Sequence, residues 1–138
     1  MTMRSVPVSD GVQWVGAIDW NLRDFHGYET PRGTTYNAYV VQGTEQTALI
    51  DTVKLPFVGE LLSRVASVVD PAEVDLIVVN HVEPDHNGGL RAVMEAMPNA
   101  RVIATRSGVA GVAEYHDGLE IEQIPADPID LGGKTLHF

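Results

Sequence analysis

Residues 74–90 read VDLIVVNHVEPDHNGGL, an aliphatic run followed at once by a cluster of polar side chains. The run 74–79 predicts a strand that is buried on both faces, because such strands lack alternating polar residues. The cluster after it contains His81, Glu83, Asp85 and His86. Ligands of α/β proteins usually bind at the carboxyl ends of the strands. We therefore predict a binding site directly after a central strand.

The spacing within the cluster is typical of a metal site. Side chains two positions apart lie on the same side of an extended segment, so His81 and Glu83 are expected to point together. Pro84 disfavours helix at Glu83, and the adjacent Asp85 and His86 must diverge. The segment can thus offer two ligand pairs, His81 with Glu83 and Asp85 with His86, to two neighbouring metal ions. The alternative is a solvated polar loop with a helix cap.

The flanking segments alternate between strand and helix patterns. Strand-like runs occupy residues 12–19, 34–43, 46–51, 100–105 and 119–125. Apolar residues at helical spacing follow Pro56 and recur in 90–97 and 106–115. Segment 20–33 is rich in Gly, Pro and polar residues and predicts a long irregular loop. This order predicts an α/β fold in which helices cover a mixed sheet.

Turns and aromatic residues refine this prediction. GTE separates runs 34–43 and 46–51, which is a hairpin signal. Asn87-Gly88-Gly89 predicts a tight backbone turn into the next helix. The aromatic residues Trp14, Trp20 and Tyr36 are assigned to the core. The last run, 133–138, begins a strand and stops at Phe138, so residues 1–138 are expected to be the N-terminal portion of a larger fold.

Composition narrows the function classes. The net charge of −10 argues against nucleic acid or an anionic membrane surface as a partner. The absence of cysteine excludes disulfides, zinc–thiolate sites, iron–sulfur clusters and cysteine nucleophiles. No apolar run approaches membrane-spanning length, and the start lacks the apolar core of a signal peptide. The expected location is the cytoplasm.

The motif H-x-E-x-D-H after an aliphatic strand resembles that of flavodiiron proteins, also called A-type flavoproteins or rubredoxin:oxygen oxidoreductase-like proteins. The upstream segments DFHGYETPRGTTYNAYVV (24–41) and ALIDTVK (48–54) are also similar to this family, as is the closing GGKTLHF. The resemblance covers nearly the whole chain. It implies the N-terminal part of a metallo-β-lactamase-like αβ/βα sandwich.

The resemblance also implies an activity. Flavodiiron proteins reduce O2 to water or NO to N2O at two irons, with electrons from FMN in a flavodoxin-like domain and from rubredoxin or a similar donor. They pair head to tail, so a homodimer or a higher homo-oligomer is expected. The later iron ligands and the FMN domain would lie beyond Phe138. We therefore expect no FMN bound by this chain and little or no turnover from residues 1–138 alone.

Further residues gain roles only through this resemblance. His26 lies in a loop that the family places beside the diiron pocket, and Tyr28 would share that wall; the alternative for His26 is a loop histidine without a role. Asp51 resembles an aspartate that supports the metal motif, and its alternative is a strand-end turn residue. His116 is expected at the surface of a helix end, and His137 is expected to be structural.

Glu83 distinguishes between two metal chemistries. Hydrolases of the metallo-β-lactamase superfamily generally carry histidine at this position and bind zinc. A carboxylate hardens the site and adds negative charge, which favours iron, especially Fe(III). Two alternatives stay open: a zinc-dependent hydrolase of the same superfamily, and a non-catalytic module that retains the fold.

Overall fold

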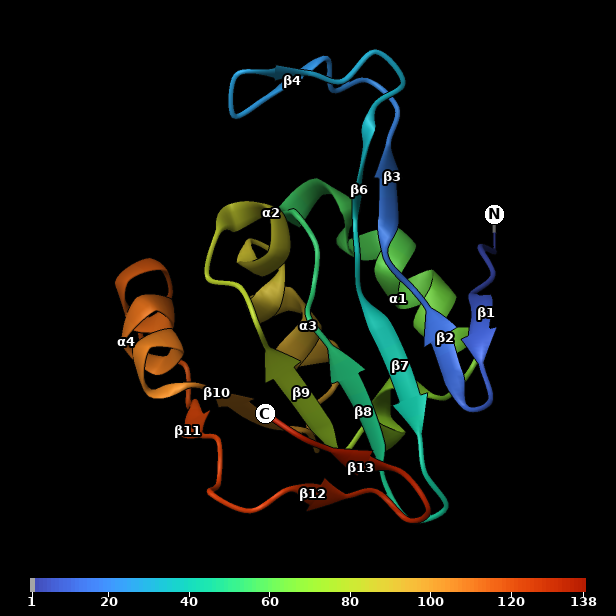
Figure 1. The fold of residues 1–138 in the computed structure, drawn as a ribbon, viewed down its shortest axis with the longest axis vertical. Helices are drawn as coiled ribbons and strands as arrows, with labels where there is room; N and C mark the ends of the chain where they lie inside the picture. Colours follow the sequence, from blue (N-terminus) through green and yellow to red (C-terminus); the bar gives the residue numbers. More distant parts are fainter. Residues whose placement is uncertain (1) are drawn as a thin grey trace.

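The structure, a computed structural model, describes residues 2–138, and its centre is a seven-stranded mixed sheet (Figure 1). Across the sheet the order is β1-β2-β7-β8-β9-β10-β11. The strands are β1 (Val6–Ser9), β2 (Val12–Trp14), β7 (Tyr39–Gln42), β8 (Thr47–Ile50), β9 (Leu76–Val79), β10 (Arg101–Ala104) and β11 (Glu122–Gln123). The four strands β1, β2, β7 and β8 pair antiparallel, whereas β8, β9, β10 and β11 are parallel. The mixed sheet and the β7–β8 hairpin confirm the sequence-based predictions.

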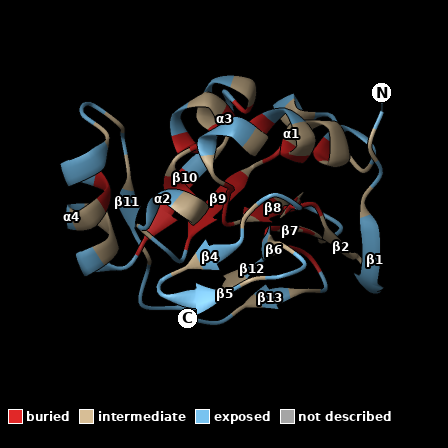
Figure 2. Cartoon of the chain, turned by 90° about the horizontal axis from the view of Figure 1, so that it is seen from above, coloured by how far each residue is buried: buried red, intermediate tan, exposed pale blue. Residues whose placement is uncertain are grey.

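Helices pack on one face of this sheet and a short hairpin lies on the other (Figure 2). The helices are α1 (Val58–Ala66), α2 (Pro84–Asn87), α3 (Leu90–Ala96) and α4 (Arg106–Tyr115), with 3-10 turns at Leu55–Phe57 and Pro71–Glu73. On the opposite face, β12 (Ile129–Asp130) pairs antiparallel with β13 (Thr135–Leu136). None of the helices in residues 2–138 has both the length and the apolarity that crossing a bilayer requires.

The central strand β9 is buried on both faces, as predicted. Ile77 and Val79 belong to the core beneath α1 and α3, while Leu76 and Val78 pack in the smaller core beside β12 and β13. All four side chains are at most 5% exposed. This double burial explains the unbroken aliphatic run, because neither face of the strand meets water.

Segment 12–36 differs from the prediction. The strand expected over 12–19 divides at Val15 and Gly16 into β2 and β3 (Ala17–Asp19), which join different sheets. The division follows a close approach, because a Cβ at Gly16 would clash with the carbonyl oxygen of Tyr36. With β6 (Thr34–Tyr36), β3 forms an arm that projects from the body (Figure 1).

The expected irregular loop 20–33 also contains regular structure. A short hairpin of β4 (Asp24–Phe25) and β5 (Tyr28–Glu29) forms the end of the arm. His26 and Gly27 make its two-residue turn, with φ of 52° and 80°. Trp20, assigned to the core from sequence, is 65% exposed on this arm, so that assignment was wrong.

A buried hydrogen bond joins the two strands of the arm, β3 and β6. The Tyr36 hydroxyl donates to Asp19 Oδ2 at 2.8 Å, and Tyr36 is 1% exposed, as its core assignment predicted. Burial by itself raises the pKa of Asp19, but hydrogen bonds from Tyr36 and from the backbone N–H groups of Asn21 and Leu22 hold this pKa below its ordinary value. Burial, followed by the contact with Asp19, raises the pKa of Tyr36. The ionised carboxylate and the neutral phenol therefore stabilise each other.

We expect Tyr36→Phe to lower the free energy of unfolding by about 1–3 kcal/mol, because it removes a donor from a buried carboxylate. The pKa of Asp19 is lower in the folded protein than its ordinary value of 3.8. The ionised Asp19 carboxylate therefore stabilises the fold above pH 3.8, and this stabilisation is lost as the pH falls through the pKa that Asp19 has in the folded protein. The difference in the free energy of unfolding between Tyr36→Phe and the wild type should thus shrink below about pH 4. Urea unfolding of both proteins at pH 7 and at pH 3.5 measures this difference. Tyr39→Phe, at a partly exposed tyrosine, is the control; an equal loss in both variants would contradict the account.

Candidate metal centre

The predicted ligand cluster lies at the carboxyl ends of two neighbouring parallel strands. Asp51 follows β8 directly, and His81 comes two residues after the end of β9. The register pairs Ile50 with Val78, which brings these two strand ends together. The backbone N–H of Asp51 also donates to the carbonyl of Val78 at 2.8 Å. Residues 30 positions apart thus meet at the site because of the parallel pairing.

Asp51 orients His81. Its Oδ1 accepts hydrogen bonds from the backbone N–H groups of Asn80 at 2.8 Å and His81 at 3.3 Å, and its Oδ2 lies 2.6 Å from His81 Nδ1. Asp51 is 5% exposed and has a φ of 60°, a left-handed conformation that aspartate tolerates better than most residues. Because an ionised carboxylate only accepts, Nδ1 of His81 carries the proton. The Nε2 atom is then left with a free lone pair, as metal binding requires.

His86 lies against His81. The two imidazole rings stack with centroids 4.4 Å apart and an interplanar angle of 29°. The Nδ1 atom of His86 is buried and has no hydrogen-bond partner among residues 2–138, while its Nε2 lies 3.4 Å from Asp85 Oδ2. The nitrogen and oxygen atoms that Asp51, His81 and His86 offer lie within 4.8 Å of one another. This spacing could enclose a metal ion.

The other two predicted ligands occupy different positions. Glu83 has an extended backbone, with φ of −66° and ψ of 145°, and directly precedes Pro84, the first residue of α2. Its side chain is exposed and lines a shallow cavity of about 220 Å³ together with His81, Thr105 and Ser107. Asp85 is partly buried on α2 beside His86. Asp85 and His86 are in contact, and Glu83 and His81 line the same cavity. The binding of a metal ion by either pair stays a prediction.

The site has an unbalanced negative charge. Asp51, Glu83 and Asp85 contribute three carboxylates, and within residues 2–138 no Lys or Arg forms an ion pair with any of them. The cluster combines carboxylate oxygens with two imidazoles, a donor set that suits iron, manganese or zinc. An unpartnered buried nitrogen on His86 and a free Nε2 on His81 fit the same conclusion. The residues present therefore fit a metal centre.

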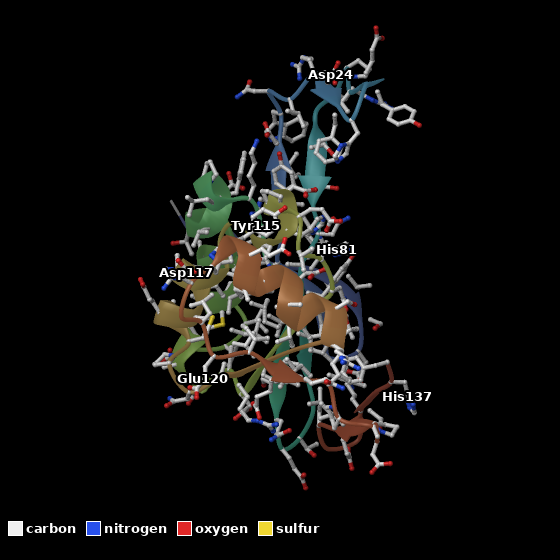
Figure 3. All side chains as sticks on the ribbon, turned by 90° about the vertical axis from the view of Figure 1, so that its left-hand side faces the viewer. Asp24, His81, Tyr115, Asp117, Glu120 and His137 are labelled. Carbon is white, nitrogen blue, oxygen red and sulfur yellow. The ribbon has the colours of Figure 1, made fainter. Side chains whose placement is uncertain are left out.

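His26 and Tyr28 lie on the arm. The His26 ring packs edge-on against Phe25 at 4.2 Å, and Tyr28 is 77% exposed. In residues 2–138 neither side chain makes a hydrogen bond or ring contact with the motif, and Figure 3 shows the neighbouring Asp24 at the end of the molecule, beyond His81. Their expected place beside the metals therefore stays a prediction. His137 is exposed and lies away from His81 (Figure 3).

Comparison with known proteins decides the family. Residues 34–137, most of the chain, match the sequence profile described as "ODP family beta lactamase". The chain belongs to the ODP family. This match includes Asp51 and the whole motif 81–86, but the first strands and the β4–β5 hairpin precede it.

Several relatives of this ODP-family chain carry the names of oxidoreductases. The chain is 50% identical over 140 residues to the rubredoxin-oxygen oxidoreductase of Megalodesulfovibrio gigas, covering 99% of this chain and 35% of that protein. It is 40% identical over 138 residues to a nitric oxide reductase of Moorella thermoacetica, covering 96% and 34%. The chain thus spans about a third of the length of the known relatives it matches.

Solved structures agree with the ODP assignment. The rubredoxin oxygen:oxidoreductase from Desulfovibrio gigas superimposes with a TM-score of 0.87 at 40% identity, covering 96% of this chain and 34% of that one. The flavodiiron protein from Giardia intestinalis gives a TM-score of 0.87 at 31% identity, with coverages of 96% and 33%. A metallo-beta-lactamase from Cronobacter sakazakii, at 18% identity and a TM-score of 0.72, covers 96% of this chain and 52% of that one and shares the fold alone. The resemblance to flavodiiron proteins and the metallo-β-lactamase-like fold are confirmed.

Sequence reasoning about this ODP-family site missed residues that form hydrogen bonds to the backbone of the motif and of the residue after it. The Thr52 hydroxyl donates to the His86 carbonyl at 2.6 Å, and Asn87 Nδ2 donates to the His81 carbonyl at 3.1 Å. His116 Nε2 lies 3.0 Å from the Asn87 carbonyl, so its ring is partly buried instead of lying at the surface. Thr52 is adjacent to Asp51, the predicted supporting residue, and Asn87 is adjacent to His86, a predicted ligand, which is a signal that could have drawn attention to both. His116 has no such signal.

The predicted turn into the next helix is confirmed, because Gly88 and Gly89 form the turn between α2 and α3. Both glycines have helical backbone angles, with φ of −57° and −86°. Glycine is required there by close packing, because a Cβ at Gly88 would lie 2.6 Å from the carbonyl oxygen of Pro84. The end of the motif therefore lies on α2, and the close-packed turn at Gly88 and Gly89 leads directly into α3.

Proposed function

We propose that residues 1–138 are the N-terminal portion of the metallo-β-lactamase-like domain of a diiron oxidoreductase that reduces O2 to water, NO to N2O, or both. The observation that carries this proposal is the H-x-E-x-D-H segment at the strand ends, with His81 oriented by Asp51. Two relatives are named rubredoxin-oxygen oxidoreductase and nitric oxide reductase, and these names support the same chemistry. Reduction of O2 to two waters consumes four electrons and four protons, and coupling of two NO molecules to N2O and water consumes two of each.

Each residue of the motif has a role in this proposal. His81 and Glu83 would hold one iron, and Asp85 and His86 would hold the other. When bound, the two irons would supply the electrons and an open position for O2 or NO. Asp51 keeps the proton of His81 on Nδ1 and so leaves Nε2 for the metal. The uncompensated carboxylates favour a highly charged cation over a neutral ligand.

The remaining parts of the proposal concern groups outside this chain. FMN would be bound by a flavodoxin-like domain elsewhere in the complete protein, and rubredoxin or a similar protein would deliver electrons. The protein would act in the cytoplasm as a homodimer or a higher homo-oligomer. His26 and Tyr28 would reach the pocket wall only as second-sphere residues. The isolated 138-residue chain would be inactive, because no residue of it is expected to bind FMN.

Gas consumption by the complete gene product tests this function. We expect the purified protein, given reduced rubredoxin under anaerobic conditions, to consume added O2 or NO in separate electrode assays and to carry FMN. The isolated 138-residue chain is the control and should consume neither. A complete protein that contains zinc, carries no flavin and hydrolyses an ester or thioester would instead identify a metallo-β-lactamase-type hydrolase. A protein that binds no metal would identify a non-catalytic module.

Glu83 provides a separate test of the metal preference. We expect Glu83→His, which recreates the H-x-H-x-D-H pattern of zinc hydrolases, to raise the ratio of zinc to iron in protein grown with both metals by roughly tenfold, because a softer ligand replaces an oxygen anion. Elemental analysis measures the ratio. Glu114→His, at an exposed position on α4, is the control. An unchanged ratio in Glu83→His would show that Glu83 does not bind the metal.

A further inference from the structure

The helix that carries two of the proposed ligands is too short to hold its own shape. Asp85 and His86 lie on α2, which has four residues. Its internal hydrogen bonds run from the N–H groups of His86 and Asn87 to the Glu83 carbonyl and from Gly88 to Pro84. A single helical turn is unstable in isolation, since helix nucleation is unfavourable. Other parts of the fold must therefore fix this turn.

Two of the fixing contacts come from the segment after β8. The Thr52 hydroxyl donates to the His86 carbonyl at 2.6 Å, and the Gly89 N–H donates to the Val53 carbonyl at 3.0 Å. These contacts hold the side of α2 that faces β8. They leave the carbonyl of Asn87, at the end of the turn, to be held by another element.

His116 supplies that contact. It is the C-cap residue of α4, and its Nε2 lies 3.0 Å from the Asn87 carbonyl. A carbonyl oxygen only accepts, so Nε2 is the donor. The imidazole is partly buried between two cavities, one of about 180 Å³ bordered by Val82 and Pro84 and one of about 320 Å³ bordered by Leu55. Figure 3 shows the preceding Tyr115 at the end of α4 that reaches the level of His81.

Asn87 links this contact to the rest of the motif. It is 1% exposed, and its Nδ2 donates to the His81 carbonyl at 3.1 Å. The same residue therefore accepts from His116 through its backbone and holds His81 through its side chain. Since His86 directly precedes Asn87, a shift of the Asn87 carbonyl moves both histidines of the site.

We infer that His116 is a positioning residue, which together with Asn87 forms a clamp that fixes α2 and thereby the relative placement of His81 and His86. The inference rests on the proposed metal centre for its functional consequence, but the clamp itself consists only of hydrogen bonds between protein groups. Asp51 acts on His81 from the β8 side, and the clamp acts from the α4 side. The ligand histidines are thus held from two directions by residues outside the proposed set of metal ligands.

Three variants of the complete gene product test the clamp. His116→Leu removes the donor but keeps an apolar side chain, His116→Gln keeps an N–H donor at similar reach, and Glu114→Gln changes an exposed residue of the same helix. Hydrogen exchange of residues 84–88 in metal-free protein is the first readout. The rate at which a chelator extracts iron from the loaded protein is the second.

We expect His116→Leu to speed exchange in residues 84–88 and iron release by roughly tenfold each, the size typical for residues that orient metal ligands. Exchange in α1 should stay unchanged. His116→Gln should show exchange and iron-release rates within about threefold of the wild-type rates. Glu114→Gln should show the wild-type rates. Wild-type behaviour of His116→Leu, or equal defects in the Leu and Gln variants, would overturn the inference. If the wild type binds no iron, the proposed function fails, and the exchange measurement alone decides the clamp.

Discussion

Replacing His81 with alanine is expected to remove iron from the complete protein and to abolish gas reduction. Both the side chain and the backbone of His81 are fixed by hydrogen bonds. Asp51 keeps the imidazole proton on Nδ1, and Asn87 Nδ2 donates to the His81 carbonyl. Residues that only orient a ligand already change metal affinity or activity by roughly 10- to 100-fold. Loss of the ligand itself should lower O2 or NO consumption by at least about 100-fold and iron content by about half or more.

The stability of the fold should survive this substitution. The His81 side chain is 50% exposed and belongs to neither hydrophobic cluster, so its removal leaves no core cavity. It does take a donor from the buried Asp51 carboxylate, which should lower the free energy of unfolding by about 1–3 kcal/mol. Iron content by elemental analysis and electrode assays measure the effect, with His137→Ala as the matched control at another exposed histidine. Full iron occupancy in His81→Ala would show that His81 is not an iron ligand.

Asp51→Asn is expected to have the second-largest effect, through the protonation of His81. The carboxylate now accepts from the Asn80 and His81 backbone N–H groups through Oδ1 and from the His81 imidazole through Oδ2. An asparagine has a single oxygen, so its amide group would face one of these donors with its own N–H bonds. If the amide faces His81, it favours a proton on Nε2, the atom that the metal needs. Iron affinity should fall by roughly 10- to 100-fold.

The fold should tolerate this second variant. Asparagine adopts a φ near 60° readily, so the loss of stability should stay within about 1–2 kcal/mol. Competition with a chelator of known affinity measures iron binding. Asp75→Asn is the control, because its carboxylate accepts from the Thr47 N–H at the opposite end of β8 and β9. Unaltered iron affinity in Asp51→Asn would mean that Asp51 is only a strand-end residue.

The elements that sequence predicted well are those governed by local pattern. The unbroken aliphatic run of β9, the β7–β8 hairpin around GTE and the helical spacing in α1 and α4 each follow from burial of one or two faces. The split at Gly16 could not be predicted, because it depends on the close approach of Tyr36, twenty residues later. The β4–β5 hairpin was hidden because its strands are two residues long and carry no alternation.

The site shows the same division. Spacing identified His81, Glu83, Asp85 and His86 as ligand-type residues, and a family resemblance pointed to Asp51. The geometry that connects them arises from parallel pairing of strands distant in the chain, which no local pattern reveals. His116 contacts Asn87 across 29 residues only because α4 packs against the end of β10 and reaches back to α2. Its role could therefore emerge only from the fold.

The acidic character of the site links these structural details to function. Two imidazoles and the Asp51 carboxylate converge at the strand ends, and Glu83 and Asp85 belong to the same segment as the imidazoles. No Lys or Arg of residues 2–138 forms an ion pair with any of these three carboxylates. A hydrolase of this fold and an iron reductase would share the same scaffold, so the fold cannot separate them. The distinction rests on Glu83, whose carboxylate favours iron over zinc.

Mössbauer spectroscopy with elemental analysis of the complete gene product, grown with both iron and zinc, tests the central claim most directly. The account predicts about two irons per polypeptide, with a spectrum of two adjacent, magnetically coupled Fe(III) ions in the oxidised protein. Zinc in place of iron, or a single isolated iron, would contradict a diiron centre built on the His81–His86 segment.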